Sequence, residues 1–154
     1  MKIDARMRRR ARILAMQALY SMDVGDASPQ AALEAAQGLD RDMHEGMDES
    51  AIAYGEALVS EVNSQRSRID DLIAAASTQW RVDRMSRLDV QILRVASAEL
   101  LANREDVPTP VVIDEAVELA REFGGDSSPG FVNGVLDSIA RTLDAGNLKV
   151  EPRP

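Results

Sequence analysis

The stretch TPVVIDEAVELAREFGGDSSPGFVNGVLDSIARTL, residues 109–143, decides the fold, because it describes two consecutive amphipathic helices joined by a short turn. Thr109-Pro110 is a capping residue followed by proline, which is typical of a helix start, and Gly124-Gly125 is typical of a helix stop. Ser128-Pro129 repeats the start pattern for the second helix, which we expect to stop at Gly146. Apolar residues at helical spacing predict the buried faces: Ile113, Ala116, Val117, Ala120, Phe123, Val132, Val135, Leu136, Ile139 and Leu143.

The same helical periodicity extends over the earlier part of the chain. It predicts helices over about 11–25, 29–38, 52–73 (with a break at Asn63-Ser64) and 88–103. No segment alternates between apolar and polar residues for long enough to predict a strand. We therefore expect an all-α fold of six or seven helices that share one core, in two sub-bundles that meet near Trp80.

The length of 154 residues favours one domain and allows a sizeable core without disulfides or metals. No linker or internal repeat divides the sequence. We expect the helical domain to span residues 1–146 and residues 147–154 to form a loose tail.

Composition excludes several classes of protein. The chain has no cysteine, which excludes disulfides, thiol catalysis and zinc–thiolate sites. No apolar run approaches the roughly 20 residues of a membrane span. The basic N-terminus and the uncharged run 13–22 are similar to a secretory signal, but Gln17 and Tyr20 interrupt the run and no small-x-small cleavage site follows it. We expect a cytoplasmic protein.

The sequence offers no catalytic constellation. The single histidine, His44, lies outside any HExxH pattern, and neither a P-loop nor GxGxxG is present. Residues 125–127 are similar to part of the GDSG sequence of serine proteases but stand between two predicted helices. Glu115, Glu118 and Glu122 share a helix face that could bind a divalent cation, although we interpret it as a solvated face with Arg121 nearby. We predict no enzyme activity, no cofactor and no metal.

The net charge of −8 hides a polarised molecule. Residues 1–12 hold six basic side chains and one acid, which gives +5, whereas the other 142 residues hold 12 basic and 25 acidic side chains, which gives −13. Such asymmetry indicates a phosphate-bearing partner for the basic end.

The basic end has the chemistry of a nucleic-acid site. On a helix Arg8 and Arg12 stack at i, i+4, Arg9 lies beside Arg12, and Tyr20 follows near the same side. Arginine forks grip phosphates and an aromatic ring can stack an unpaired base. Because cations at a helix N-terminus oppose the macrodipole, helix stability does not explain them. The pattern predicts binding of single-stranded RNA or DNA.

The block Ser127–Leu136 is the second informative stretch. Gly130 and Gly134 fall in the first turns of a predicted helix, where each costs about 1 kcal/mol relative to alanine. This cost indicates close approach of another helix or of a ligand, and we assign Gly134 to close packing. Spacing alone leaves the roles of Phe131 and Asn133 open.

Five segments in order carry a family resemblance: RRRAR (8–12), MQALY (16–20), LDVQILRVASAELL (88–101), VPTPVVIDEAVELAREFG (107–124) and SPGFVNGVL (128–136). They resemble the bacterial transcription antitermination factor family NusB, over about residues 6–143. The resemblance implies an all-α fold of two packed helical sub-bundles. It also implies pairing with NusE, a ribosomal protein, and binding of boxA RNA in the antitermination complex of RNA polymerase.

Matched position by position, the resemblance implies an RNA face and a partner face. The RNA face would comprise Arg8, Arg9, Arg12, Gln17, Tyr20, Phe131 and Asn133. The NusE face would comprise Arg84, Arg87 and Asp89 at the start of the helix that contains Leu88. Some members carry lysine where this chain has Gly130, so we expect weak RNA affinity without the protein partner. Some members also self-associate through the RNA face, which leaves a homodimer open.

The leading hypothesis is a non-enzymatic transcription antitermination factor that binds boxA-type single-stranded RNA together with NusE and supports ribosomal RNA operon transcription. Two alternatives stay open at this point. One is a helical protein-interaction module without RNA binding, and the other is an accessory domain related to those of RNA cytosine methyltransferases.

Overall fold

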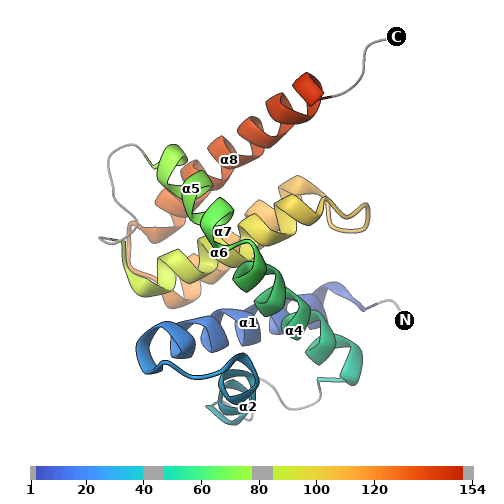
Figure 1. Cartoon of the computed structure of the whole chain (residues 1–154), viewed down its shortest axis with the longest axis vertical. Helices are drawn as coiled ribbons and strands as arrows, with labels where there is room; N and C mark the ends of the chain where they lie inside the picture. The colour runs from blue at the N-terminus through green and yellow to red at the C-terminus, as the bar shows by residue number, and fades with distance from the viewer. Residues whose placement is uncertain (1–2, 40–46, 78–84, 151–154) are drawn as a thin grey trace. The chain divides into compact units, whose positions relative to one another are not determined.

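The computed structural model describes residues 3–39, 47–77 and 85–150. These ranges contain seven helices and no strand, which confirms the predicted all-α class (Figure 1). The helices are α1 (Ala5–Gly25), α2 (Pro29–Leu39), α4 (Glu49–Ser64), α5 (Arg66–Ala76), α6 (Arg87–Ala102), α7 (Thr109–Phe123) and α8 (Ser128–Val150).

The chain divides into two compact units, Met1–Arg66 and Ser67–Pro154. The division falls at the predicted break after Asn63-Ser64, whereas the expectation that the sub-bundles meet near Trp80 is wrong. Trp80 itself lies outside the described residues. The α4–α5 junction therefore separates the units because Gln65, the C-cap of α4, interrupts the helix there.

Unit 1 is built on α1, against which α2 and α4 pack. The residues from Ala11 to Met16 are buried. A Cβ added at Gly55 of α4 would lie 3.1 Å from both the Ala11 carbonyl oxygen and Leu14 Cδ2, so glycine allows the two helices to approach closely.

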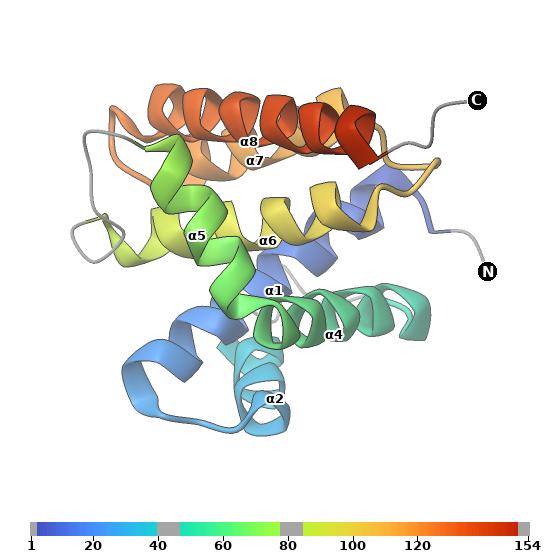
Figure 2. The same cartoon turned by 45° about the horizontal axis from the view of Figure 1, so that its top comes forward.

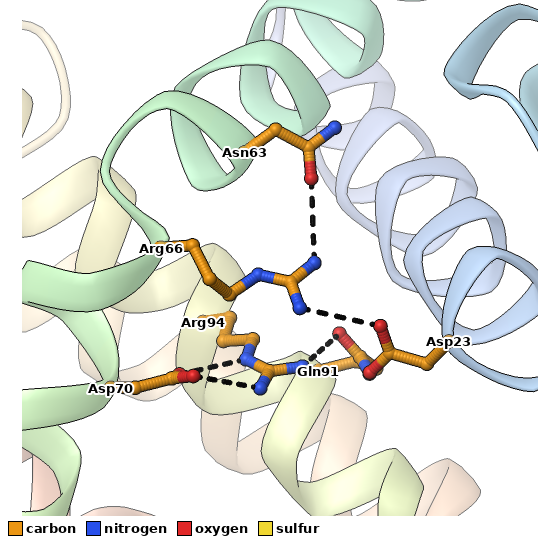
Figure 3. A network of polar contacts seen from close by, with 6 residues as sticks. All are labelled: Asp23, Asn63, Arg66, Asp70, Gln91 and Arg94. Atoms are coloured by element: carbon orange, nitrogen blue, oxygen red, sulfur yellow. Dashed lines mark hydrogen bonds and ion pairs between the residues drawn. The ribbon is translucent and has the colours of Figure 1, made fainter. Parts of the chain in front are cut away.

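Arg66 makes polar contacts with the ends of two helices of unit 1. Arg66 donates from Nη1 to Asp23 Oδ1 at 3.3 Å and from Nη2 to Asn63 Oδ1 at 3.3 Å (Figure 3). One guanidinium thus joins the end of α4 to the last turn of α1.

Unit 2 is built on α6, which packs against α7 and α8 (Figure 2). Every residue from Asp89 to Leu100 is buried, including charged ones. Arg94 donates from Nε and Nη2 to the two carboxylate oxygens of Asp70 on α5, at 2.9 Å each, and from Nη1 to Gln91 at 3.5 Å (Figure 3). This bidentate geometry is the strong form of the arginine–carboxylate pair, so it fixes α5 to α6.

The predicted core faces of α7 and α8 are largely confirmed. Most of the apolar residues predicted to face inward are buried, while Val117, Phe123 and Leu143 are half-buried. The apolar period of 3.6 residues therefore identified the inward faces of these two helices correctly.

Three predicted helix ends differ in detail. Thr109 is the first helical residue of α7 rather than its cap, because the extended backbone of Pro108 takes the capping position. Ser128 is likewise the first helical residue of α8, and its hydroxyl has another use described below. Helix α8 continues through Gly146 to Val150, because one glycine in a helix costs only about 1 kcal/mol and neighbouring residues can outweigh it.

We predict that Asp70→Ala lowers the free energy of unfolding by about 1–2 kcal/mol, because it leaves the buried Arg94 guanidinium without its carboxylate, while partial exposure of Asp70 reduces the loss. Asp71→Ala changes an exposed neighbour on the same helix and should alter stability by less than about 0.5 kcal/mol. Urea denaturation followed by circular dichroism measures both. Equal effects of the two substitutions would contradict a structural role for the Asp70–Arg94 pair.

Candidate nucleic-acid interface

The start of α1 gathers the basic side chains that the sequence indicated. Asp4 caps the helix by accepting a hydrogen bond from the Met7 amide at 2.8 Å, so the cations begin on an ordered first turn. Arg9 is exposed, and Arg8 is half-buried with its Nη1 donating to the Ile3 carbonyl oxygen at 3.2 Å. Unit 1 therefore presents cationic groups at this end of the helix.

The remaining predicted RNA residues on α1 do not form one continuous exposed stripe with Arg8 and Arg9. Arg12 is only 3% exposed and is engaged in an interaction within the protein. Gln17 is half-buried and also engaged, while Tyr20 is 38% exposed at the far end of the helix. Because residues 11–16 are all buried, the exposed surface of α1 is split into a basic start and a separate aromatic position.

The other two predicted RNA residues lie near the start of α8, in unit 2. Phe131 is half-buried and Asn133 is exposed. Their neighbours Gly130 and Gly134 are exposed, and a Cβ added to either would meet no atom of the described structure within 4 Å beyond its own stretch of α8. The assignment of Gly134 to close helix packing is therefore wrong, because no helix within residues 3–39, 47–77 and 85–150 approaches it.

Two of the three predicted partner residues, Arg87 and Asp89, belong to the start of α6. Arg87 is exposed, whereas Asp89 is 8% exposed, and Arg84 lies outside the described residues. Ser86 caps the helix by accepting from the Asp89 amide at 3.0 Å. Only Arg87 is therefore a surface residue among the partner residues that the structure describes.

Sequence reasoning missed the contact of Ser128 with the predicted partner residue Asp89. Ser128 donates from its hydroxyl to Asp89 Oδ2 at 2.9 Å and accepts from the Gly125 amide at 3.0 Å. This contact joins residues 39 apart in the chain, so no local pattern could reveal it. The predicted use of Ser128 as a helix cap is wrong, since the hydroxyl faces α6.

Other candidate sites gain no support from the structure. Within the described ranges, no group of three or more acidic or histidine side chains could hold a metal ion. Glu118 instead pairs with Arg121 on an exposed face of α7. His44 lies outside the described residues, and no helix in the described part of the chain is both long and apolar enough to cross a membrane.

Comparison with known proteins gives the same family as the sequence motifs. The NusB family matches residues 9–141, which include Arg9 and Arg12 on α1, all of α6 and the first turns of α8. The chain belongs to the NusB family. Two transcription antitermination proteins NusB are similar: that of Geobacter sulfurreducens is 44% identical over 138 residues, and that of Anaeromyxobacter dehalogenans 43% over 142, each covering 88% of this chain and more than nine-tenths of the relative. These relatives are transcription factors, which supports a non-enzymatic role at the level of the family.

Solved NusB structures share the fold. T. maritima NusB is 35% identical, covers 92% of this chain and 93% of its own, and has a TM-score of 0.77. A structure of the antitermination factors NusB and NusE in complex with dsRNA also has a TM-score of 0.77, covers 90% of this chain and 99% of its own and is 24% identical, which shows the fold alone. The all-α NusB architecture is therefore established for this chain.

We predict that Gly134→Ala raises the free energy of unfolding by about 0.5–1 kcal/mol, because alanine favours the helix and its Cβ would meet no neighbouring helix among the described residues. Gly124→Ala should have the opposite sign, since its Cβ would lie 2.6 Å from the Ser128 hydroxyl oxygen. Thermal and urea denaturation of both variants measure the difference. Destabilisation by Gly134→Ala would mean that a packing contact exists there after all.

Proposed function

We propose that this protein is a transcription antitermination factor that binds boxA-type single-stranded RNA together with NusE, a small-subunit ribosomal protein. It acts in the cytoplasm, within the antitermination complex of RNA polymerase, and supports transcription of ribosomal RNA operons. The observation that carries the proposal is the basic start of α1, with exposed Arg9 and half-exposed Arg8, on a chain of the NusB family. The proposal extends to this chain the assembly of NusB, NusE and RNA named for the structural relative.

The residues proposed for the RNA face are Arg8, Arg9, Arg12, Gln17 and Tyr20 of unit 1, and Phe131 and Asn133 of unit 2. Their exposure assigns them different tasks. Arg9 and Arg8 can grip phosphates, and Tyr20 can stack an unpaired base, since these side chains reach solvent. Buried Arg12 supports α1 from within and adds positive potential behind the contact surface.

Charge outside the basic end favours the same arrangement. Residues 13–154 carry −13, and the exposed face of α7 includes Asp114, Glu118 and Glu122. Such a surface repels RNA and attracts a basic protein, so it confines RNA to the cationic positions.

The NusE face of the proposal comprises Arg87 and Asp89 at the start of α6, together with Arg84, which lies outside the described residues. Arg87 is the first residue of the helix, where a cation opposes the macrodipole and is exposed to solvent. Because the position weakens the helix, an intermolecular contact is the better explanation for it. Asp89 lies beneath this surface.

The central experiment is fluorescence anisotropy with a boxA RNA oligonucleotide, with and without NusE, from about 50 to 200 mM salt. We expect salt-sensitive binding that NusE strengthens, and preference over an RNA of scrambled sequence. Binding to NusE without any change in the anisotropy of the RNA would favour the alternative function, a helical protein-interaction module without RNA binding. Sedimentation over a concentration series tests self-association, which RNA should oppose if the homodimer uses the RNA face.

The double substitution Arg8→Ala and Arg9→Ala should weaken boxA binding roughly tenfold and reduce the salt slope by about 1.4, since each single-strand phosphate contact contributes about 0.7. The matched control is Arg121→Ala with Arg141→Ala, which removes the same charge from exposed positions on α7 and α8. An equal loss in both double variants would show that only net charge matters and would contradict the assigned face.

Arg87→Ala should weaken NusE binding about tenfold, as expected for an arginine at the centre of an interface, and leave RNA binding of the isolated chain unchanged. Arg141→Ala is the control for loss of one exposed arginine. Isothermal titration with purified NusE measures both. A dissociation constant equal to that of the unmodified chain would exclude Arg87 from the partner contact.

A further inference from the structure

The carboxylate of Asp89 is directed away from its own helix end. Ser86-Arg87-Leu88-Asp89 has the spacing of a capping box, in which the carboxylate at the fourth position would accept from the amide of the first. Only half of this box forms, because Ser86 accepts from the Asp89 amide while Asp89 Oδ2 accepts from Ser128 on α8. The local capping interaction has been replaced by a contact between helices.

The orientation of the Asp89 side chain leaves one of its carboxylate oxygens unsatisfied in the described structure. Asp89 Oδ1 is buried and has no hydrogen-bond partner among the residues that the structure describes. A buried carboxylate oxygen without a donor destabilises a protein, so stability of α6 alone does not explain why the side chain turns toward Ser128.

The Ser128 hydroxyl connects three parts of unit 2. It donates to Asp89 at the start of α6, accepts from the Gly125 amide in the α7–α8 turn, and belongs to the first residue of α8. Gly124 makes room for it, because any Cβ there would lie 2.6 Å from the hydroxyl oxygen. The site is therefore shaped to hold this hydroxyl in one place.

The first turn of α8 needs such a restraint. Gly130 in the first turn and Gly134 in the second have poor helix propensity, and the described structure holds no packing contact that compensates for it. Phe131 lies three residues after Ser128 and is held by its amide to the Ser127 carbonyl oxygen at 3.1 Å. The direction in which Phe131 and Asn133 leave the helix thus depends on how Ser128 is fixed.

We propose that Asp89 and Ser128 are positioning residues for RNA binding: the Asp89–Ser128 hydrogen bond fixes the first turn of α8 so that Phe131 and Asn133 present a preorganised surface to single-stranded RNA. The inference rests on the proposed function, in which these two α8 residues contact RNA. It gives Asp89 a role in RNA binding that does not require the protein partner.

The test measures binding of a boxA RNA oligonucleotide to the full chain without NusE, by fluorescence anisotropy at fixed salt and at a temperature where circular dichroism shows every variant folded. Ser128→Ala and Asp89→Ala should each weaken binding about tenfold, and together no more than either alone. Asp89→Asn should stay within about threefold of the unmodified chain, because the amide oxygen can still accept from Ser128. Ser127→Ala, at the exposed neighbour, is the matched control and should have no effect.

A double-mutant cycle with Phe131→Ala separates positioning from general destabilisation. If Ser128 acts by positioning Phe131 and Asn133, Ser128→Ala should weaken binding more in the unmodified chain than in the Phe131→Ala background, where only Asn133 is left to position. An equal additional loss in both backgrounds, or unchanged binding by Ser128→Ala alone, would overturn the proposal.

Different experimental results would contradict the proposed function and the positioning role of Ser128. Phe131→Ala with weakened binding and Ser128→Ala without effect would overturn only the positioning role. Phe131→Ala without effect would overturn the positioning role together with the α8 part of the RNA face. RNA binding as such would then be judged by the Arg8 and Arg9 double variant.

Discussion

Burial of α6 along its length is the constraint on which unit 2 depends. A helix surrounded on all sides cannot leave its polar groups to water, and a buried group without a partner costs about 1–3 kcal/mol. Arg94 therefore donates to both carboxylate oxygens of Asp70, and Asp89 accepts a hydrogen bond from the Ser128 hydroxyl. Polar contacts from α6 thus fix the neighbouring helices α5 and α8, in addition to the apolar packing on α7 and α8.

Helix positions were predictable because their determinants are local. Ser28 accepts from the Ala31 amide at 3.2 Å at the predicted start of α2, and α7 gives way to a turn at Gly124. The break at Asn63-Ser64 separates α4 from α5 as expected. Caps, prolines and glycines act within one turn of the helix that they begin or end, so a single sequence contains enough information to place them.

The candidate site was less predictable because burial of polar residues depends on contacts far along the chain. Arg12 has the spacing of a surface arginine beside Arg8, yet it is buried, since α1 is enclosed over residues 11–16 rather than along a single stripe. The Asp89–Ser128 contact likewise joins two helices that sequence periodicity treats separately. Motif resemblance named the positions of the proposed RNA face, and only the structure distinguishes those that reach solvent from those that support them.

The helix starts that hold the proposed functional residues each contain residues that destabilise the helix locally. The first turns of α1 and α6 hold arginines, although a cation at a helix N-terminus destabilises the helix by roughly 0.3–1 kcal/mol. The first turn of α8 holds Gly130, which has poor helix propensity. Each start is then held by one specific side chain: Asp4 caps α1, Ser86 caps α6, and Ser128 bonded to Asp89 holds α8. Helix starts expose amides and side chains that a ligand can reach, and their local instability explains why each one needs its own restraint.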